Sequence, residues 1–147
     1  MTPKQLEESW IVKNGYMTAF EIMTKGVYFQ EIKEELQAII SAYPEGATAF
    51  NRAFDMTFLE DYGINFPKLL ACPMLRCVDI LKLPPTERMK QYRPDIKYKT
   101  PNCEQAYNYF FPEDSYVEKH RGADDAMHEA GIVWKLIELK RKEGVSK

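Results

Sequence analysis

The chain has 147 residues, a formal net charge of −2 and a hydrophobic content of 45%. These values predict one packed domain spanning residues 1–147 and exclude a disordered chain. The near-neutral charge also weighs against a protein that binds nucleic acid mainly by neutralising phosphates, although an enzyme with a local groove stays compatible with it.

The cysteines and the hydropathy pattern bear on the compartment. Cys72, Cys77 and Cys103 are odd in number and form no C-x-x-C pair, so we interpret them as reduced, buried thiols. A zinc site made of Cys72, Cys77 and a histidine is the alternative. No apolar run reaches the ~20 residues of a membrane span, and no signal-peptide core is visible. We therefore expect a soluble, cytoplasmic protein with no membrane partner.

The first half of the chain predicts strands and helices in alternation. Strands are expected at residues 8–13 and 47–50, and helices at 29–43 and 53–62. Asn14-Gly15 is typical of a tight turn after the first strand. Apolar residues recur with a helical period across the first helix, which Pro44-Glu45-Gly46 ends. Gly63 ends the second helix.

The second half continues this pattern. A strand followed by a helix is expected at residues 75–83, a loop or lid at 84–101, and helices at 102–111 and 122–142. Asn102 is a candidate N-cap, and Lys140, Arg141 and Lys142 suit the negative end of the last helix. The alternation predicts an α/β fold.

Two segments carry candidate functional residues. In the segment 120–130, His120 precedes Asp125 by five residues, and Asp125 lies in the first turn of the last helix. That helix is apolar on two faces, so Asp125 is expected to face protein or a cleft. In the segment 50–59, Asn51 precedes Asp55 near another helix start. The simpler alternative is that both aspartates complement helix dipoles, that Asn51 caps a helix and that His120 is a surface or hydrogen-bonded histidine.

These two segments resemble the third (H-x-A-x-x-D-A) and second (H-N-x-x-F-D-x-x-F-L) motifs of DEDD-type 3′–5′ exonucleases, the family of proofreading epsilon subunits of DNA polymerase III. The resemblance implies a ribonuclease H-like mixed sheet flanked by helices. It also implies two divalent ions, Mg²⁺ or Mn²⁺, with Asp55 and Asp125 as metal ligands. His120 matches the general base that activates water, and Asn51 matches a substrate-binding position. Phe50 stands where the family has histidine.

The family's first motif, D-x-E on an N-terminal strand, does not occur in the chain. Residues 10–14 look like the third family strand, so the first two strands are expected to be missing. Either an upstream fragment or a second copy would then complete the site, or the fold is rebuilt for a non-catalytic role. The open strand edge would drive self-association.

The function expected from the resemblance is metal-dependent hydrolysis of single-stranded DNA or RNA from its 3′ end. The basic, aromatic region with Arg88, Lys90, Arg93 and 97–99 is a candidate groove wall; an ordinary solvated loop is the alternative. A non-catalytic accessory protein that binds nucleic acid or a polymerase is the alternative function.

Overall fold

The computed structural model describes residues 2–145, and within this range every regular element is a helix. The helices are α1 (Pro3–Glu7), α2 (Trp10–Lys13), α3 (Ala19–Lys25), α4 (Phe29–Ala42), α5 (Arg52–Asp61), α6 (Pro73–Leu81), α7 (Glu87–Tyr92), α8 (Cys103–Phe110) and α9 (Gly122–Val145). Between 2 and 145, β pairing is limited to one isolated parallel bridge, Ala47 with Leu69. The expected α/β, ribonuclease H-like sheet is therefore wrong for the described residues, and with it the strand edge that was expected to drive self-association.

The three predicted strands fail for identifiable reasons. Residues 10–13 form α2, and the turn at Asn14 and Gly15 (φ 74°) ends this helix instead of joining two strands. A residue with positive φ ends a helix as readily as it makes a hairpin. Ala47 alone makes the β bridge in the second segment. The third segment lies in α6, where Pro73 at the start favours a helix.

The helical predictions with clear end signals are confirmed. α4 and α5 match the expected ranges to within a residue, and Gly63 (φ 82°) follows α5. Asn102 caps α8 by accepting a hydrogen bond from the Gln105 backbone, while the Gln105 side chain accepts one from the Asn102 backbone. This reciprocal pair satisfies two donors that a helix start otherwise leaves unpaired. The expected loop at 84–101 contains the short helix α7.

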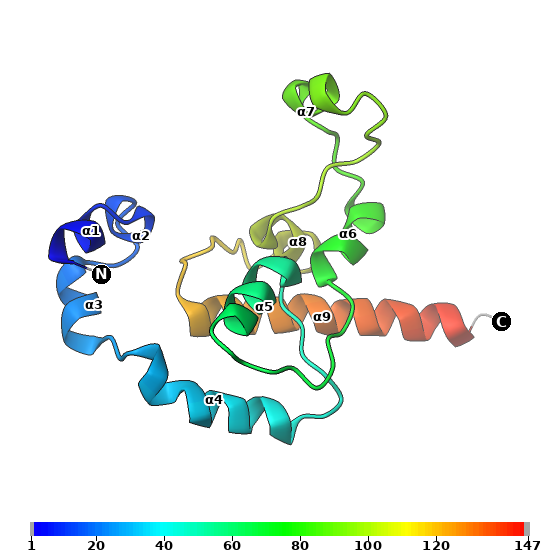
Figure 1. Ribbon diagram of the computed structural model, residues 1–147. Coiled ribbons are helices and arrows are strands. Elements are labelled where there is room, and N and C mark those ends of the chain that lie inside the picture. The colour runs from blue at the N-terminus through cyan, green and yellow to red at the C-terminus, as the bar shows by residue number, and fades with distance from the viewer. Residues whose placement is uncertain (1, 146–147) are drawn as a thin grey trace.

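The core lies where α6, α8 and α9 pack together (Figure 1). Its buried members are small or aromatic except for Ile132: Phe50, Cys77, Cys103, Ala106, Tyr116 and Ile132. Gly131 of α9 lets α8 approach closely, because a Cβ there would lie 3.3 Å from the Tyr107 ring. The cysteines are free and buried, which confirms that they behave as small hydrophobic side chains. None of them belongs to the group of potential metal ligands found among residues 2–145.

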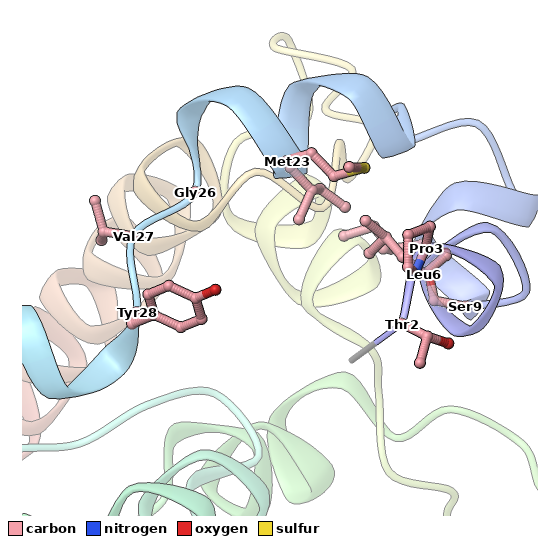
Figure 2. A pocket seen from close by; sticks show the side chains of 10 residues that line it. Thr2, Pro3, Leu6, Ser9, Met23, Gly26, Val27 and Tyr28 are labelled. Atoms are coloured by element: carbon pink, nitrogen blue, oxygen red, sulfur yellow. The ribbon is translucent and has the colours of Figure 1, made fainter.

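The N-terminal helices α1–α3 form a small lobe away from this core, and α4 connects the lobe to α5 (Figure 1). A cavity of about 590 Å³ lies in the lobe. Figure 2 shows Pro3 and Leu6 of α1 across from Met23 of α3 at this cavity. Its lining is mostly apolar and includes Val27 and Tyr28, which are 60% and 78% exposed.

The chain exposes more surface than a compact monomer of its mass. Its accessible surface is 10988 Å², whereas a folded 17.2 kDa monomer exposes about 7,800 Å². Many large apolar side chains share this exposure, among them Phe20 at 74%, Phe54 at 73% and Met127 at 74%. Exposed apolar surface on this scale is typical of a protein with a partner. In the described part of the chain, no helix has both the length and the apolar character needed to cross a bilayer.

Candidate metal site

A cavity of about 970 Å³ lies between the N-terminal lobe and the core. Its lining comes from six places in the sequence: α2, the turn before α5, α5 itself, the start of α6, the segment from Thr100 to the start of α8, and the segment from Glu118 into α9. Asn51, Asp55, His120 and Asp125 all contribute to this lining. The structure therefore brings the four residues singled out in the sequence to one cavity, although they belong to two distant segments.

Asp125 is held in place by a tyrosine. It lies in the first turn of α9, and its Oδ1 accepts a hydrogen bond of 3.0 Å from the Tyr116 hydroxyl. Tyr116 is itself buried and stacks on His128, with 3.8 Å between ring centroids. His128 lies with Nδ1 2.7 Å from the Asp124 carbonyl oxygen. This chain of contacts fixes the Asp125 carboxylate at the cavity.

His120 precedes α9 in the left-handed backbone region, with φ of 52°. Its ring packs edge-on against Tyr16 and Trp10 from the N-terminal lobe, at centroid distances of 4.2 and 5.1 Å. Nδ1 lies 3.8 Å from Glu118 Oε1, close enough for the carboxylate to orient the imidazole electrostatically. A non-glycine residue with positive φ costs conformational energy, which the packing of the ring offsets.

Two carboxylates at the cavity were not predicted. Glu118 lies two residues before His120, and Glu129 lies one helical turn after Asp125. The Oε2 of Glu129 accepts a 2.8 Å hydrogen bond from the Phe50 backbone N–H. The spacing of four residues between Asp125 and Glu129 places both on one helix face and was the available sequence signal. Glu118 had no such signal, because it lies outside any helix.

Asn51 and Asp55 come from the other side of the cavity. Asn51 is the N-cap residue of α5 with φ of 61°, and its side chain makes no capping hydrogen bond. The simple capping alternative is therefore wrong for this side chain. Burial raises the pKa of Asp55, and the hydrogen bond to its own backbone N–H opposes this increase.

The cavity concentrates negative charge without a balancing cation. Its charged lining residues are Asp55, Glu118, Asp125 and Glu129, and neither lysine nor arginine appears among the described residues that line it. Burial raises the pKa of Glu118, an effect that His120 opposes and Asp125 reinforces. Burial also raises the pKa of Glu129, where Asp55, Glu118 and Asp125 add electrostatic repulsion. Such a group of carboxylates is stabilised by a cation.

The donor atoms suit a divalent metal ion. One side-chain ligand atom each from Glu118, His120 and Asp125 lies within 4.8 Å of the others. Cis ligands of an ion at 2.0–2.2 Å are about 3 Å apart, so side-chain rotations would be enough to close the group. Carboxylates favour Mg²⁺ and Mn²⁺, and imidazole is accepted more readily by Mn²⁺ than by Mg²⁺. The residues present therefore fit one ion held by Glu118, His120 and Asp125, whereas Asp55 and Glu129 line the same cavity outside this group.

Comparison with known proteins adds no relative to this picture. No protein family, curated protein or solved structure matches the chain. The resemblance to the exonuclease family thus rests on the two sequence motifs alone.

Proposed function

We propose that the chain is a metal-dependent phosphodiesterase that shortens single-stranded nucleic acid from its 3′ end. The observation that carries this proposal is the convergence of Asp55, His120 and Asp125 at one cavity that also contains Glu118 and Glu129. Two-metal phosphoryl-transfer sites are built from carboxylates grouped in this way. The resemblance of the two motifs suggests the reaction, and the cavity contains the carboxylates and the histidine that this reaction would use.

Each residue has a stated task in this proposal. Asp125 and Glu118 would hold the first ion, and Asp55 with Glu129 would provide oxygens for a second. Bound there, the ions would lower the pKa of a water molecule and stabilise charge on the phosphate that this water attacks, as the P–O3′ bond to the remaining strand breaks. His120 takes a proton from that water, and the nearby Glu118 carboxylate stabilises the imidazolium that results. The Tyr116 hydroxyl keeps Asp125 oriented.

The role of His120 can be separated from that of a metal ligand. A nitrogen that donates its lone pair to a metal cannot accept a proton, so the two roles predict different kinetics for His120→Ala. If His120 is the base, the variant loses turnover and keeps its Mn²⁺ affinity. If it is a ligand, Mn²⁺ affinity falls as well.

The decisive experiment follows a 5′-labelled single-stranded oligonucleotide with Mn²⁺ or Mg²⁺ and with chelator. We expect a metal-dependent ladder that shortens from the 3′ end and is lost in Asp125→Asn. The matched control is Asp124→Asn, because Asp124 is the adjacent residue on α9 but contacts Lys119 and His128 instead of lining the cavity. A folded protein that binds Mn²⁺ without cleaving either DNA or RNA would contradict the proposal and favour the non-catalytic accessory function.

A further inference from the structure

A basic arm projects from the core between α6 and α8. It comprises residues 84–99 and includes α7. The segment extends away from the core helices and then returns to α8 (Figure 1). Its two ends meet at a narrow neck, where the Lys99 N–H donates a 3.0 Å hydrogen bond to the Leu83 carbonyl. The arm makes no packed core of its own, and most of its residues are exposed.

Charge is unevenly divided between the arm and the rest of the chain. The arm has five basic and two acidic residues, a net charge of +3, whereas the other residues include fifteen basic and twenty acidic ones, a net charge of −5. A positive projection on a negative protein is oriented toward polyanions by its field. The arm is thus one part of this chain that can attract a phosphate backbone.

Most basic side chains of the arm form no ion pair with a described residue. Lys90 pairs with Glu87 at 2.7 Å, and Lys97 lies 5.2 Å above the Tyr98 ring. Arg88 and Arg93 are exposed and form no ion pair with any described residue. Guanidinium groups that are not held by carboxylates can bind phosphate oxygens without first breaking an internal pair.

An exposed aromatic ring lies beside these cations. Tyr92, the last residue of α7, is 77% exposed, and its ring contacts no other aromatic ring among residues 2–145. An isolated tyrosine next to arginine side chains combines the two elements by which proteins hold unpaired bases, a stacking surface and cations for the backbone. Double-stranded nucleic acid, whose bases are already stacked, would use only the cations.

The arm returns to the molecule at the carboxylate cavity. Thr100, Pro101 and Asn102 follow the arm directly and line the cavity. A nucleic-acid strand bound along the arm would therefore extend toward the cavity. The negatively charged lining of the cavity by itself repels phosphate. The arm supplies attraction where the cavity lining cannot.

We propose that the arm binds single-stranded nucleic acid, with Arg88, Arg93 and Lys97 on the phosphates and Tyr92 stacked on a base. This inference deepens the proposed function by assigning the surface that holds the substrate, but binding does not depend on cleavage. It is therefore tested with the full chain in chelator, where no metal-dependent reaction occurs.

The first measurement is fluorescence anisotropy of labelled oligo(dT) and oligo(rU) against salt concentration. Each phosphate contact on a single strand adds about 0.7 to the salt slope, so Arg88→Ala/Arg93→Ala/Lys97→Ala should reduce the slope by about 2 and weaken binding on the order of tenfold. The control is Lys4→Ala/Lys13→Ala/Lys25→Ala, which removes three exposed cations from the N-terminal lobe. This variant should leave the salt slope and the affinity unchanged. Equal effects of the two triple variants would overturn the proposal.

The second measurement separates stacking from charge. Tyr92→Ala should weaken binding about 5- to 100-fold with an unchanged salt slope, and Tyr92→Phe should bind normally, because stacking requires the ring and not the hydroxyl. The matched control is Tyr28→Ala, since Tyr28 is 78% exposed but lies at the N-cap of α4, outside the arm. Normal binding by Tyr92→Ala, or tighter binding of a duplex than of a single strand, would overturn the proposal.

The two proposals fail in different ways. Binding through the arm in a protein that never cleaves would contradict the phosphodiesterase and support the arm. Metal-dependent cleavage that is unaffected by the arm variants would support the phosphodiesterase and contradict the arm.

Discussion

The hydroxyl of Tyr116 donates a hydrogen bond of 3.0 Å to Oδ1 of Asp125, and this contact links the buried core to the candidate metal site. Tyr116 is 6% exposed, and its backbone is fixed by Asn108, whose side chain bonds both the N–H and the carbonyl of Tyr116. Burial and the hydrogen bond to Asp125 raise the pKa of Tyr116, so its hydroxyl keeps the proton that it donates. The orientation of Asp125 is thus determined by core packing.

Tyr116→Phe is therefore expected to weaken divalent metal binding. Removing a hydrogen bond that orients a metal ligand typically costs about 10- to 100-fold in affinity. Titration with Mn²⁺ followed by calorimetry would measure the change. The control is Tyr107→Phe, which removes a similar 2.9 Å hydrogen bond from Tyr107 to Asp114 outside the cavity. Equal affinities in the two variants would show that the Tyr116 hydroxyl does not contribute to metal binding.

Glu129→Gln should raise the thermal stability of the metal-free protein. The substitution removes one of four grouped negative charges, and an amide oxygen can still accept the hydrogen bond from Phe50. Differential scanning fluorimetry in chelator would show a higher Tm than that of the wild type, and added Mn²⁺ would stabilise the variant less than the wild type. Glu138→Gln on the same helix, where Glu138 bonds Trp134 and Lys135, should lack this effect.

The stabilisation by Glu129→Gln should depend on pH. The raised pKa of Glu129 means that the folded protein retains a proton which the unfolded chain, with a glutamate pKa of about 4.3, has released. The folded state then binds more protons, so the Glu129 contribution to stability falls as the pH rises above that value. The Tm difference between Glu129→Gln and wild type should be small near pH 4 and increase toward pH 7. A constant difference across this range would contradict the assignment of charge repulsion.

Cys77 and Cys103 should resist alkylation in the folded protein. Burial raises the pKa of Cys77 to about 11 and that of Cys103 to about 12, so neither forms the reactive thiolate near neutral pH. Above the unfolded pKa of about 8.5, the unfolded chain loses protons that the folded chain keeps, and stability decreases with rising pH. Mass spectrometry after iodoacetamide treatment at pH 8 would show slow labelling of both residues until denaturant is added. Rapid native labelling would mean that the α6–α8–α9 core opens readily.

The exposed surface predicts self-association. The excess over a compact monomer is about 3,200 Å², more than the share of one subunit in most obligate dimers. The net charge of −2 offers little repulsion between copies. Light scattering after size exclusion at micromolar concentration should give a mass well above 17.2 kDa. A mass of 17.2 kDa would contradict the prediction.

Sequence patterns identified the helices wherever a local signal set both ends. Apolar residues recur with a helical period in α4, and Asn102 caps α8. Both signals involve residues that are close in the sequence and need no distant partner. The predicted strands depended on distant pairing, which a short apolar segment such as 47–50 cannot specify. At the cavity, Asp55, His120 and Asp125 were found through the motif resemblance. Glu118 was not found in this way, because its place at the cavity depends on the path of the segment before α9.

The neck of the basic arm has a consequence for how this chain can vary. Because Leu83 and Lys99 are joined by a backbone hydrogen bond, the segment between them begins and ends at nearly the same point. The segment could be lengthened, shortened or exchanged for another without moving α6 relative to α8, since the cost of closing a loop grows slowly with its length. The surface that the arm presents could then change by insertion and deletion at one place, while the carboxylates of the cavity keep their positions.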